Sequence, residues 1–146
     1  MKSEQGFTLI EVLIALVVLS IGLLGLAMLQ LEGIKYNTDA YLRTQASVLA
    51  YEIIDRMKAN SSAANAGSYV AAAAPTSETC GSTSPGCTDT ATLAAYDLSV
   101  WYTRLGEALP AGPTPSSISS VGSQHTIVVR WNERNIEKSR TWIVQL

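Results

Sequence analysis

The chain has 146 residues, one domain's worth of sequence, and its 10 basic and 12 acidic side chains leave a formal net charge of −2. This balance argues against a nucleic-acid-binding protein that works by bulk positive charge. Hydrophobic residues make up 47% of the chain, and the mean hydropathy is +0.18. Because one long uncharged run supplies most of this hydropathy, the composition argues against a polytopic membrane protein and a wholly cytosolic globular protein.

The first predicted element is an apolar helix. Residues 12–31 carry no charge, and Ser20 and Gln30 are their only polar members. Twenty helical residues span about 30 Å, the thickness of a bilayer's hydrocarbon core. A cleaved secretory signal has a shorter apolar run of about 7–15 residues, followed by a small-residue cleavage site that is not found here. We therefore expect a helix that crosses the membrane, and a plain single-pass anchor is its simplest interpretation.

Glu11 does not fit a plain anchor, because it lies next to the uncharged run. A lone carboxylate in hydrocarbon costs roughly 2.5 kcal/mol or more unless it finds a partner. That partner must carry a positive charge or donate a proton, and the nearest basic residue precedes Gly6. Glu11 is therefore a candidate functional residue.

Residues 6–13 read GFTLIEVL and resemble the N-terminal motif of type IV prepilins and type II secretion pseudopilins. The resemblance implies that a prepilin peptidase cuts between Gly6 and Phe7 and then N-methylates Phe7. Glu11 becomes the fifth mature residue, which is the position of the family's acid. The new cationic amine can neutralise the Glu11 carboxylate in its own chain or in a neighbour's. An intermolecular pair of this kind would set the axial register between packed subunits.

The next pattern indicates that the helix continues into a folded domain. Apolar residues recur at helical steps of four, three, four and four at Leu42, Ala46, Leu49, Ile53 and Met57. We predict one helix from about Phe7 to about Asn60. The expected divisions are a leader at 1–6, a transmembrane half-helix at 7–31, an amphipathic half-helix at 32–60 and a periplasmic globular pilin domain at 61–146.

The middle of the chain, residues 59–92, is rich in Ala, Ser, Thr and Gly and predicts loops. It contains Cys80 and Cys87, which we expect to form a disulfide that closes a short loop in an oxidising compartment. Zinc is the alternative, but two cysteines and the distant His125 are too few ligands. Redox catalysis would favour a Cys-x-x-Cys spacing, which this pair lacks.

The last third of the chain predicts one helix and a hairpin. An amphipathic helix over about 91–109 ends at Pro110, with Thr90 or Thr92 as its cap. Residues 126–131 and 141–146 read as strands joined by a polar hairpin loop at 132–140, and 118–121 as a short edge strand. Trp131 and Trp142 are expected to pack on the long helix. The expected fold class is α+β and type IV pilin-like, with a long N-terminal helix on a small antiparallel sheet.

The remaining polar residues predict no catalytic set, so we do not expect an enzyme, a cofactor or a bound metal. His125 is expected at an exposed strand edge, and Asp97 and Glu107 face different directions on their helix. Four basic residues near the C-terminus are offset by Glu133 and Glu137 and predict a solvated face: Arg130, Arg134, Lys138 and Arg140. DNA binding through this face is an alternative that the net charge argues against.

Residues 55–60 and 97–110, the latter following the cysteine pair, resemble PilV-type minor pilins. The absence of proline from Phe7 to Ala74 also favours a minor pilin or a pseudopilin, since many major pilins have a proline in this helix. The resemblance implies a subunit that primes pilus assembly near the pilus tip. The close alternative is a type II secretion minor pseudopilin. A more distant alternative is a pilus-tip adhesin or DNA-uptake receptor subunit.

The same resemblance implies partners and a location. The partners are the prepilin peptidase, the major pilin, other minor pilins, an inner-membrane assembly platform and the lipid bilayer, with no small-molecule substrate. The implied location is the inner membrane of a Gram-negative bacterium, with the C-terminal domain in the periplasm, and later the pilus itself.

Overall fold

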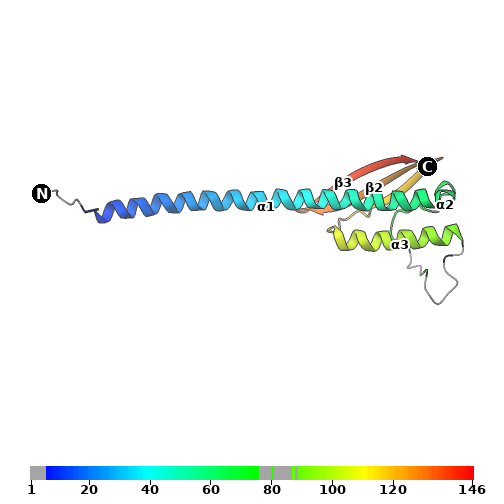
Figure 1. Cartoon of the computed structure of the whole chain (residues 1–146), viewed down its shortest axis with the longest axis horizontal. Coiled ribbons are helices and arrows are strands. Elements are labelled where there is room, and N and C mark those ends of the chain that lie inside the picture. Colours follow the sequence, from blue (N-terminus) through cyan, green and yellow to red (C-terminus); the bar gives the residue numbers. More distant parts are fainter. Residues whose placement is uncertain (1–5, 76–79, 81–86, 88) are drawn as a thin grey trace. The chain divides into compact units, whose positions relative to one another are not determined.

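The computed structural model describes residues 6–75, 80, 87 and 89–146. Within them the elements are α1 (Leu9–Ala59), α2 (Ser61–Asn65), α3 (Thr90–Ala108), β1 (Ser117–Val121), β2 (Gln124–Glu133) and β3 (Ile136–Gln145), as labelled in Figure 1. The chain forms two compact units, residues 1–40 and residues 41–146. The predicted α+β class, with a long apolar helix and a small antiparallel sheet, is confirmed.

The first unit contains the apolar part of α1. Its large apolar side chains are exposed along the whole run, with Leu9 at 92% and Met28 at 72% exposure. The hydroxyl of Ser20 donates a hydrogen bond to the Leu16 carbonyl over 2.7 Å, so this polar group is satisfied inside the helix.

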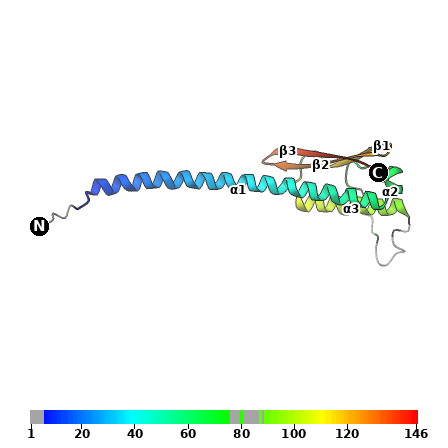
Figure 2. The ribbon, with the colours of Figure 1, turned by 45° about the horizontal axis from the view of Figure 1, so that its top comes forward.

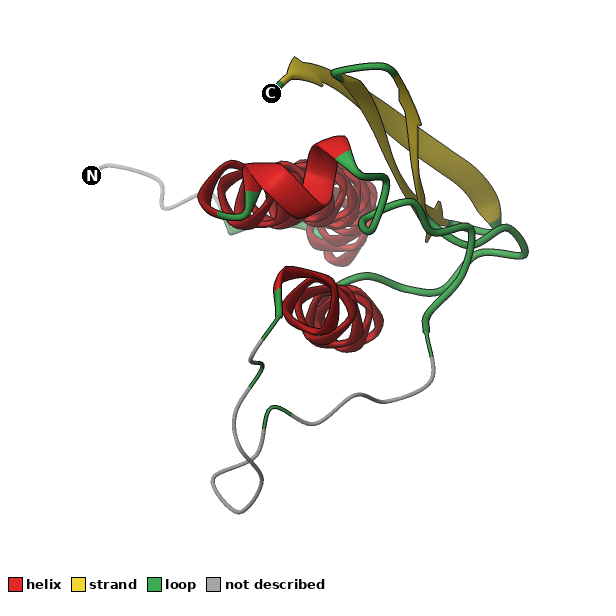
Figure 3. Cartoon of the chain, turned by 90° about the vertical axis from the view of Figure 1, so that its right-hand side faces the viewer, coloured by secondary structure: helices red, strands yellow, loops and turns green. Residues whose placement is uncertain are grey.

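The second unit places the C-terminal part of α1 against a sheet and a second helix. Figures 2 and 3 show the three strands on one side of this part of α1 and α3 on another. The sheet is antiparallel with the order β1-β2-β3, so β2 is its central strand. The fold therefore surrounds the α1 stripe with apolar side chains from α3 and β2.

Both helical stripes predicted from the sequence are buried. All five apolar positions of α1 and all five of the second helix, Ala94, Leu98, Trp101, Leu105 and Leu109, belong to the core. Trp101 is fully buried, and its indole Nε1 donates a hydrogen bond to the Leu49 carbonyl over 2.9 Å. Trp131 is fully buried as expected, and Trp142 packs against the core while partly exposed.

The cap of α3 differs from the prediction, which assigned it to Thr90 or Thr92. The N-cap is Asp89, whose carboxylate accepts from the backbone N–H groups of Ala91 at 2.9 Å and Thr92 at 2.8 Å. The Thr92 hydroxyl also donates to this carboxylate. Hydrogen bonds from the Thr92 hydroxyl and then from the backbone lower the pKa of Asp89. An ionised acceptor at the positive end of a helix satisfies two free amides at once, which a threonine does not do here.

The predicted polar hairpin loop at 132–140 is also wrong. Strands β2 and β3 are paired from Gln124↔Gln145 to Glu133↔Ile136, and only Arg134 and Asn135 form the turn. Both have positive φ, 55° and 62°, which is the backbone of a two-residue hairpin turn. The polar residues at 137–140 are therefore part of an edge strand. The predicted short edge strand at 118–121 is confirmed as β1.

The amino-terminal segment as candidate functional site

The Gly6–Phe7 peptide bond precedes the first turn of α1 in non-helical backbone. Phe7 is 83% exposed, and a Cβ added to Gly6 would meet no atom within 4 Å. Exposed, irregular backbone is the form in which peptidases cleave chains. The segment is therefore accessible at the bond where the leader is expected to end.

Thr8 and Glu11 form the start of α1. The backbone N–H of Glu11 donates to the Thr8 hydroxyl at 3.3 Å and to the Thr8 carbonyl at 3.1 Å. Thr-x-x-Glu is the spacing of a capping box, and an acid in the first turn also favours the positive end of the helix dipole. The sequence contained this signal, but the interpretation of Glu11 as a register residue did not use it. Thr8 thus caps the start of α1, and Glu11 takes part in this cap through its backbone N–H.

Phe7, just before α1, and Glu11, in its first turn, line the same surface hollow. They line it together with Val12, Ala15, Leu16 and Leu19. The hollow is largely apolar, so a carboxylate there is favoured only when a partner neutralises it. The structure thus places the expected new terminus and the acid on one local surface.

The apolar part of α1 is the only helix in the described residues that is long and apolar enough to cross a membrane, and none of the residues in its apolar window is buried. Contiguous exposed apolar surface of this kind marks a membrane or subunit contact. The predicted spanning segment therefore has the geometry of a helix whose partners lie outside its own chain.

Cys80 and Cys87 are joined by a disulfide, and their Cα atoms are 5.2 Å apart. The residues between them, 81–86, lie outside the described residues. In the described part of the chain, no group of three His, Cys, Asp or Glu side chains is arranged to hold a metal ion. The pairing fits a structural cross-link that closes a short loop.

His125 is not at an exposed edge, so that prediction is wrong. It is 1% exposed and belongs to the inward-facing residues of the central strand β2. Neither ring nitrogen has a hydrogen-bond partner in the described residues, and burial lowers the pKa of the imidazole. The strand begins at Gln124, two residues before the predicted start at 126, so His125 lies within the sheet and not at its edge.

Asp97 has a role that the sequence did not indicate. Its carboxylate lies 2.7 Å from Nη1 of Arg56 in α1 and accepts a 2.6 Å hydrogen bond from the Tyr69 hydroxyl. Burial, and then this hydrogen bond, raises the pKa of Tyr69. Arg56 also pairs with Glu52 at 3.0 Å. This polar network fixes α3 on α1, whereas Glu107 takes no part in it.

The four basic residues near the C-terminus do not share one face. Lys138 is opposite Trp131 in the register of β2 and β3, and Arg140 is opposite Val129. Trp131 and Val129 are buried, so Lys138 and Arg140 lie on the face of the sheet that is turned toward the core. Arg130 lies on the opposite side and donates to the Pro115 carbonyl at 2.7 Å. The predicted single solvated face is therefore divided.

Comparison with known proteins agrees with this geometry at the N-terminus. The family model of the prokaryotic N-terminal methylation motif matches residues 1–27. This match shows that residues 1–27 are similar to the N-terminal segment of type IV prepilins. It carries nothing specific to PilV-type minor pilins. No curated protein matches the chain, and neither does any solved structure.

Proposed function

We propose that the chain is a minor type IV pilin that takes part in the initiation of pilus assembly. In this proposal the leader, residues 1–6, is removed after Gly6, and the new terminus at Phe7 is N-methylated. The observation that carries the proposal is the methylation motif at residues 1–27, which ends in an apolar helix with no covering partner in its own unit. A structural subunit, and not an enzyme, is what this arrangement supports.

The minor-pilin assignment rests on the helix and the domain. No proline interrupts residues 7–74, and α1 is continuous from Leu9 to Ala59. The domains in this proposal are the apolar half-helix at 7–31, the amphipathic half-helix at 32–60 and a periplasmic pilin domain at 61–146. A disulfide between Cys80 and Cys87 suits that oxidising compartment. The partners would be the major pilin, other minor pilins and the assembly platform of a Gram-negative inner membrane.

N-terminal mass analysis of protein extracted from membranes tests the processing. We expect a chain that begins at N-methylated Phe7, and a full-length chain when Gly6→Ala is introduced or the peptidase is removed. Gly22→Ala is the matched control, since an added Cβ meets nothing within 4 Å at either glycine. An assembled, functional protein that keeps Met1 would contradict the proposal.

A type II secretion minor pseudopilin is the second candidate. It shares the apolar helix and the processing, and the uninterrupted helix fits it equally well. The two candidates separate by phenotype. Deletion of the gene should abolish surface pili if the protein is a minor pilin, and should block export of secreted enzymes if it is a pseudopilin.

A further inference from the structure

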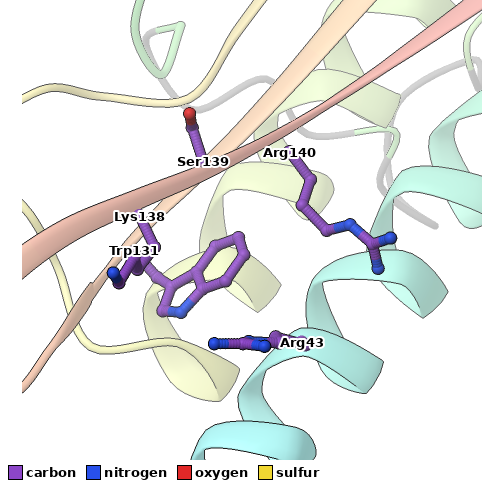
Figure 4. A pocket seen from close by; sticks show the side chains of 5 residues that line it. All are labelled: Arg43, Trp131, Lys138, Ser139 and Arg140. Carbon is purple, nitrogen blue, oxygen red and sulfur yellow. The ribbon is translucent and has the colours of Figure 1, made fainter.

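A basic hollow lies in the second unit, between α1 and the end of the β2–β3 hairpin. It has a volume of about 450 Å³ and is lined by Arg43, Trp131, Lys138, Ser139 and Arg140. Figure 4 shows the two guanidinium groups and the lysine side chain arranged around the Trp131 indole. Three cations from two elements that are far apart in sequence thus meet at one surface.

The charges in this hollow are only partly compensated. The carboxylate of Glu133 lies 3.4 Å from Nη2 of Arg43 and offsets that charge. In the part of the chain that the structure describes, neither Lys138 nor Arg140 forms an ion pair with an acid. Arg140 instead donates to the Ser47 hydroxyl at 3.4 Å and lies 5.9 Å from the Trp142 ring. The hollow therefore keeps positive charge that an anion can neutralise.

The floor of the hollow also contains an unused donor. Trp131 is 1% exposed, and its indole N–H has no acceptor in the described residues. In Figure 4 the indole nitrogen lies on the side of the ring that faces Arg43. A buried N–H without an acceptor destabilises the fold, so an acceptor that reaches it is favoured. Because the nitrogen is covered, an oxyanion reaches it only when a side chain at the rim of the hollow moves. Lys138 and Arg140 are long side chains that can change rotamer and open this path.

We propose that this hollow binds one carboxylate side chain of a partner polypeptide. Guanidinium groups bind carboxylates through paired, charge-assisted hydrogen bonds, and the Trp131 N–H can add a third. Arginine is also among the residues that contribute most at protein interfaces. The hollow lies wholly within residues 41–146, so this inference does not depend on the processing of the N-terminus.

A nucleic acid fits the hollow less well than a carboxylate. Strong binding to a phosphate backbone needs several cations along one track, but Arg130 lies on the other face of the sheet and Arg134 is 4.0 Å from Glu133. The Trp131 ring is buried and offers no free face for a base to stack on. One compact anionic group is therefore the better match.

Titration of the full chain in non-ionic detergent micelles tests this inference. The probe is a capped Gly-Glu-Gly-Glu-Gly peptide, with Gly-Gln-Gly-Gln-Gly as its neutral match and an oligothymidylate as the nucleic-acid arm. The readout is the indole N–H resonance of Trp131, assigned with Trp131→Phe. We expect the acidic peptide alone to shift this resonance, and the double variant Lys138→Gln/Arg140→Gln to weaken binding by about tenfold, or 1.4 kcal/mol.

Arg130→Gln is the matched control, because it removes one charge from the opposite face of the sheet. An unchanged Trp101 indole resonance shows that each variant keeps its core, since that N–H is bonded to the Leu49 carbonyl. The inference is overturned if the acidic peptide does not move the Trp131 resonance, if Arg130→Gln weakens binding as much as the double variant, or if the oligothymidylate binds more tightly than the peptide.

Discussion

The two units of the chain use one continuous helix in opposite ways. From Leu9 to Leu31 the apolar side chains of α1 are exposed, whereas from Leu42 to Met57 a single apolar stripe of the same helix is buried. The first part is apolar on every side and the second on one side. A helix that is apolar all round needs lipid or other helices, while a striped helix is covered by its own domain. Stability in the first unit therefore has to come from outside the chain.

The polar groups of the two units differ in the same sense. Asp97 in the second unit has its partners in its own chain, at 2.6 and 2.7 Å. Among the described residues, Glu11 in the first unit forms no ion pair, and only its backbone N–H bonds to Thr8. Substitution of Glu11 should therefore affect assembly, and substitution of Asp97 should affect folding.

The largest effect is expected at Glu11. If its charge pairs with the N-terminal amine of a neighbouring subunit, both Glu11→Ala and Glu11→Gln should reduce incorporation into filaments by about tenfold or more, without loss of membrane insertion. Incorporation is measured by immunoblotting of sheared filaments against the membrane fraction. Glu32→Gln is the control, because that acid follows the apolar run and pairs with Lys35 at 3.3 Å.

The pair of Glu11 variants also separates two roles. Glutamine can serve at the third helical position of a capping box but has no charge. Normal incorporation of Glu11→Gln together with failure of Glu11→Ala would show that Glu11 acts through the helix start, and normal incorporation of both would remove any assembly role.

Asp97 should give the next largest effect, and in the second unit only. Asp97→Ala leaves Arg56 with Glu52 alone and the buried Tyr69 hydroxyl without its acceptor. Loss of one partner of a buried pair costs about 3–5 kcal/mol, and we expect the lower end because Arg56 keeps Glu52. The thermal midpoint followed by near-ultraviolet circular dichroism should fall by about 10–20 °C.

Asp55→Ala is the control for Asp97→Ala. The Asp55 side chain is 74% exposed and pairs with Lys58, which lies in the same helix α1, so its loss should cost little. Equal midpoints for the two variants would mean that the network does not hold α3 on α1. Loss of membrane insertion in Asp97→Ala would contradict the separation of the two units.

Periodic patterns predicted most of the fold. The stripe at Leu42 to Met57 and the stripe at Ala94 to Leu109 are both buried as expected, because each depends only on spacing along one helix. The N-terminal motif is similarly local, since Gly6, Phe7 and Glu11 lie within six residues. Features of this kind are visible in a sequence without knowledge of what lies opposite.

Several features that depend on a distant partner were not predicted. The polar residues at 137–140 suggested a loop, but they belong to a strand that is fixed by pairing with β2. The partner of Asp97 is 41 residues away in α1. In the basic hollow, Arg43 is 95 residues from Lys138 and 97 from Arg140. His125 is buried because its strand, β2, is the central strand of the sheet. The order of the strands cannot be read from the residues around His125 alone.

His125 should give the smallest effect, and it extends the comparison to pH. Since burial lowers its pKa in the folded state, the unfolded chain binds more protons below its usual pKa of about 6.5, and stability should fall as pH drops below that value. One such group contributes at most about 1.4 kcal/mol per pH unit.

His125→Leu tests this, because it removes two buried nitrogens that have no partner in the described residues. At pH 7.5 the thermal midpoint of the variant should equal or exceed that of the wild type. Between pH 7.5 and pH 5 the midpoint should fall less in the variant than in the wild type. The first unit gives no such difference, because His125 is the one histidine of the chain. The same pH dependence in both proteins would assign the acid sensitivity to carboxylates and show that the buried imidazole has no part in it.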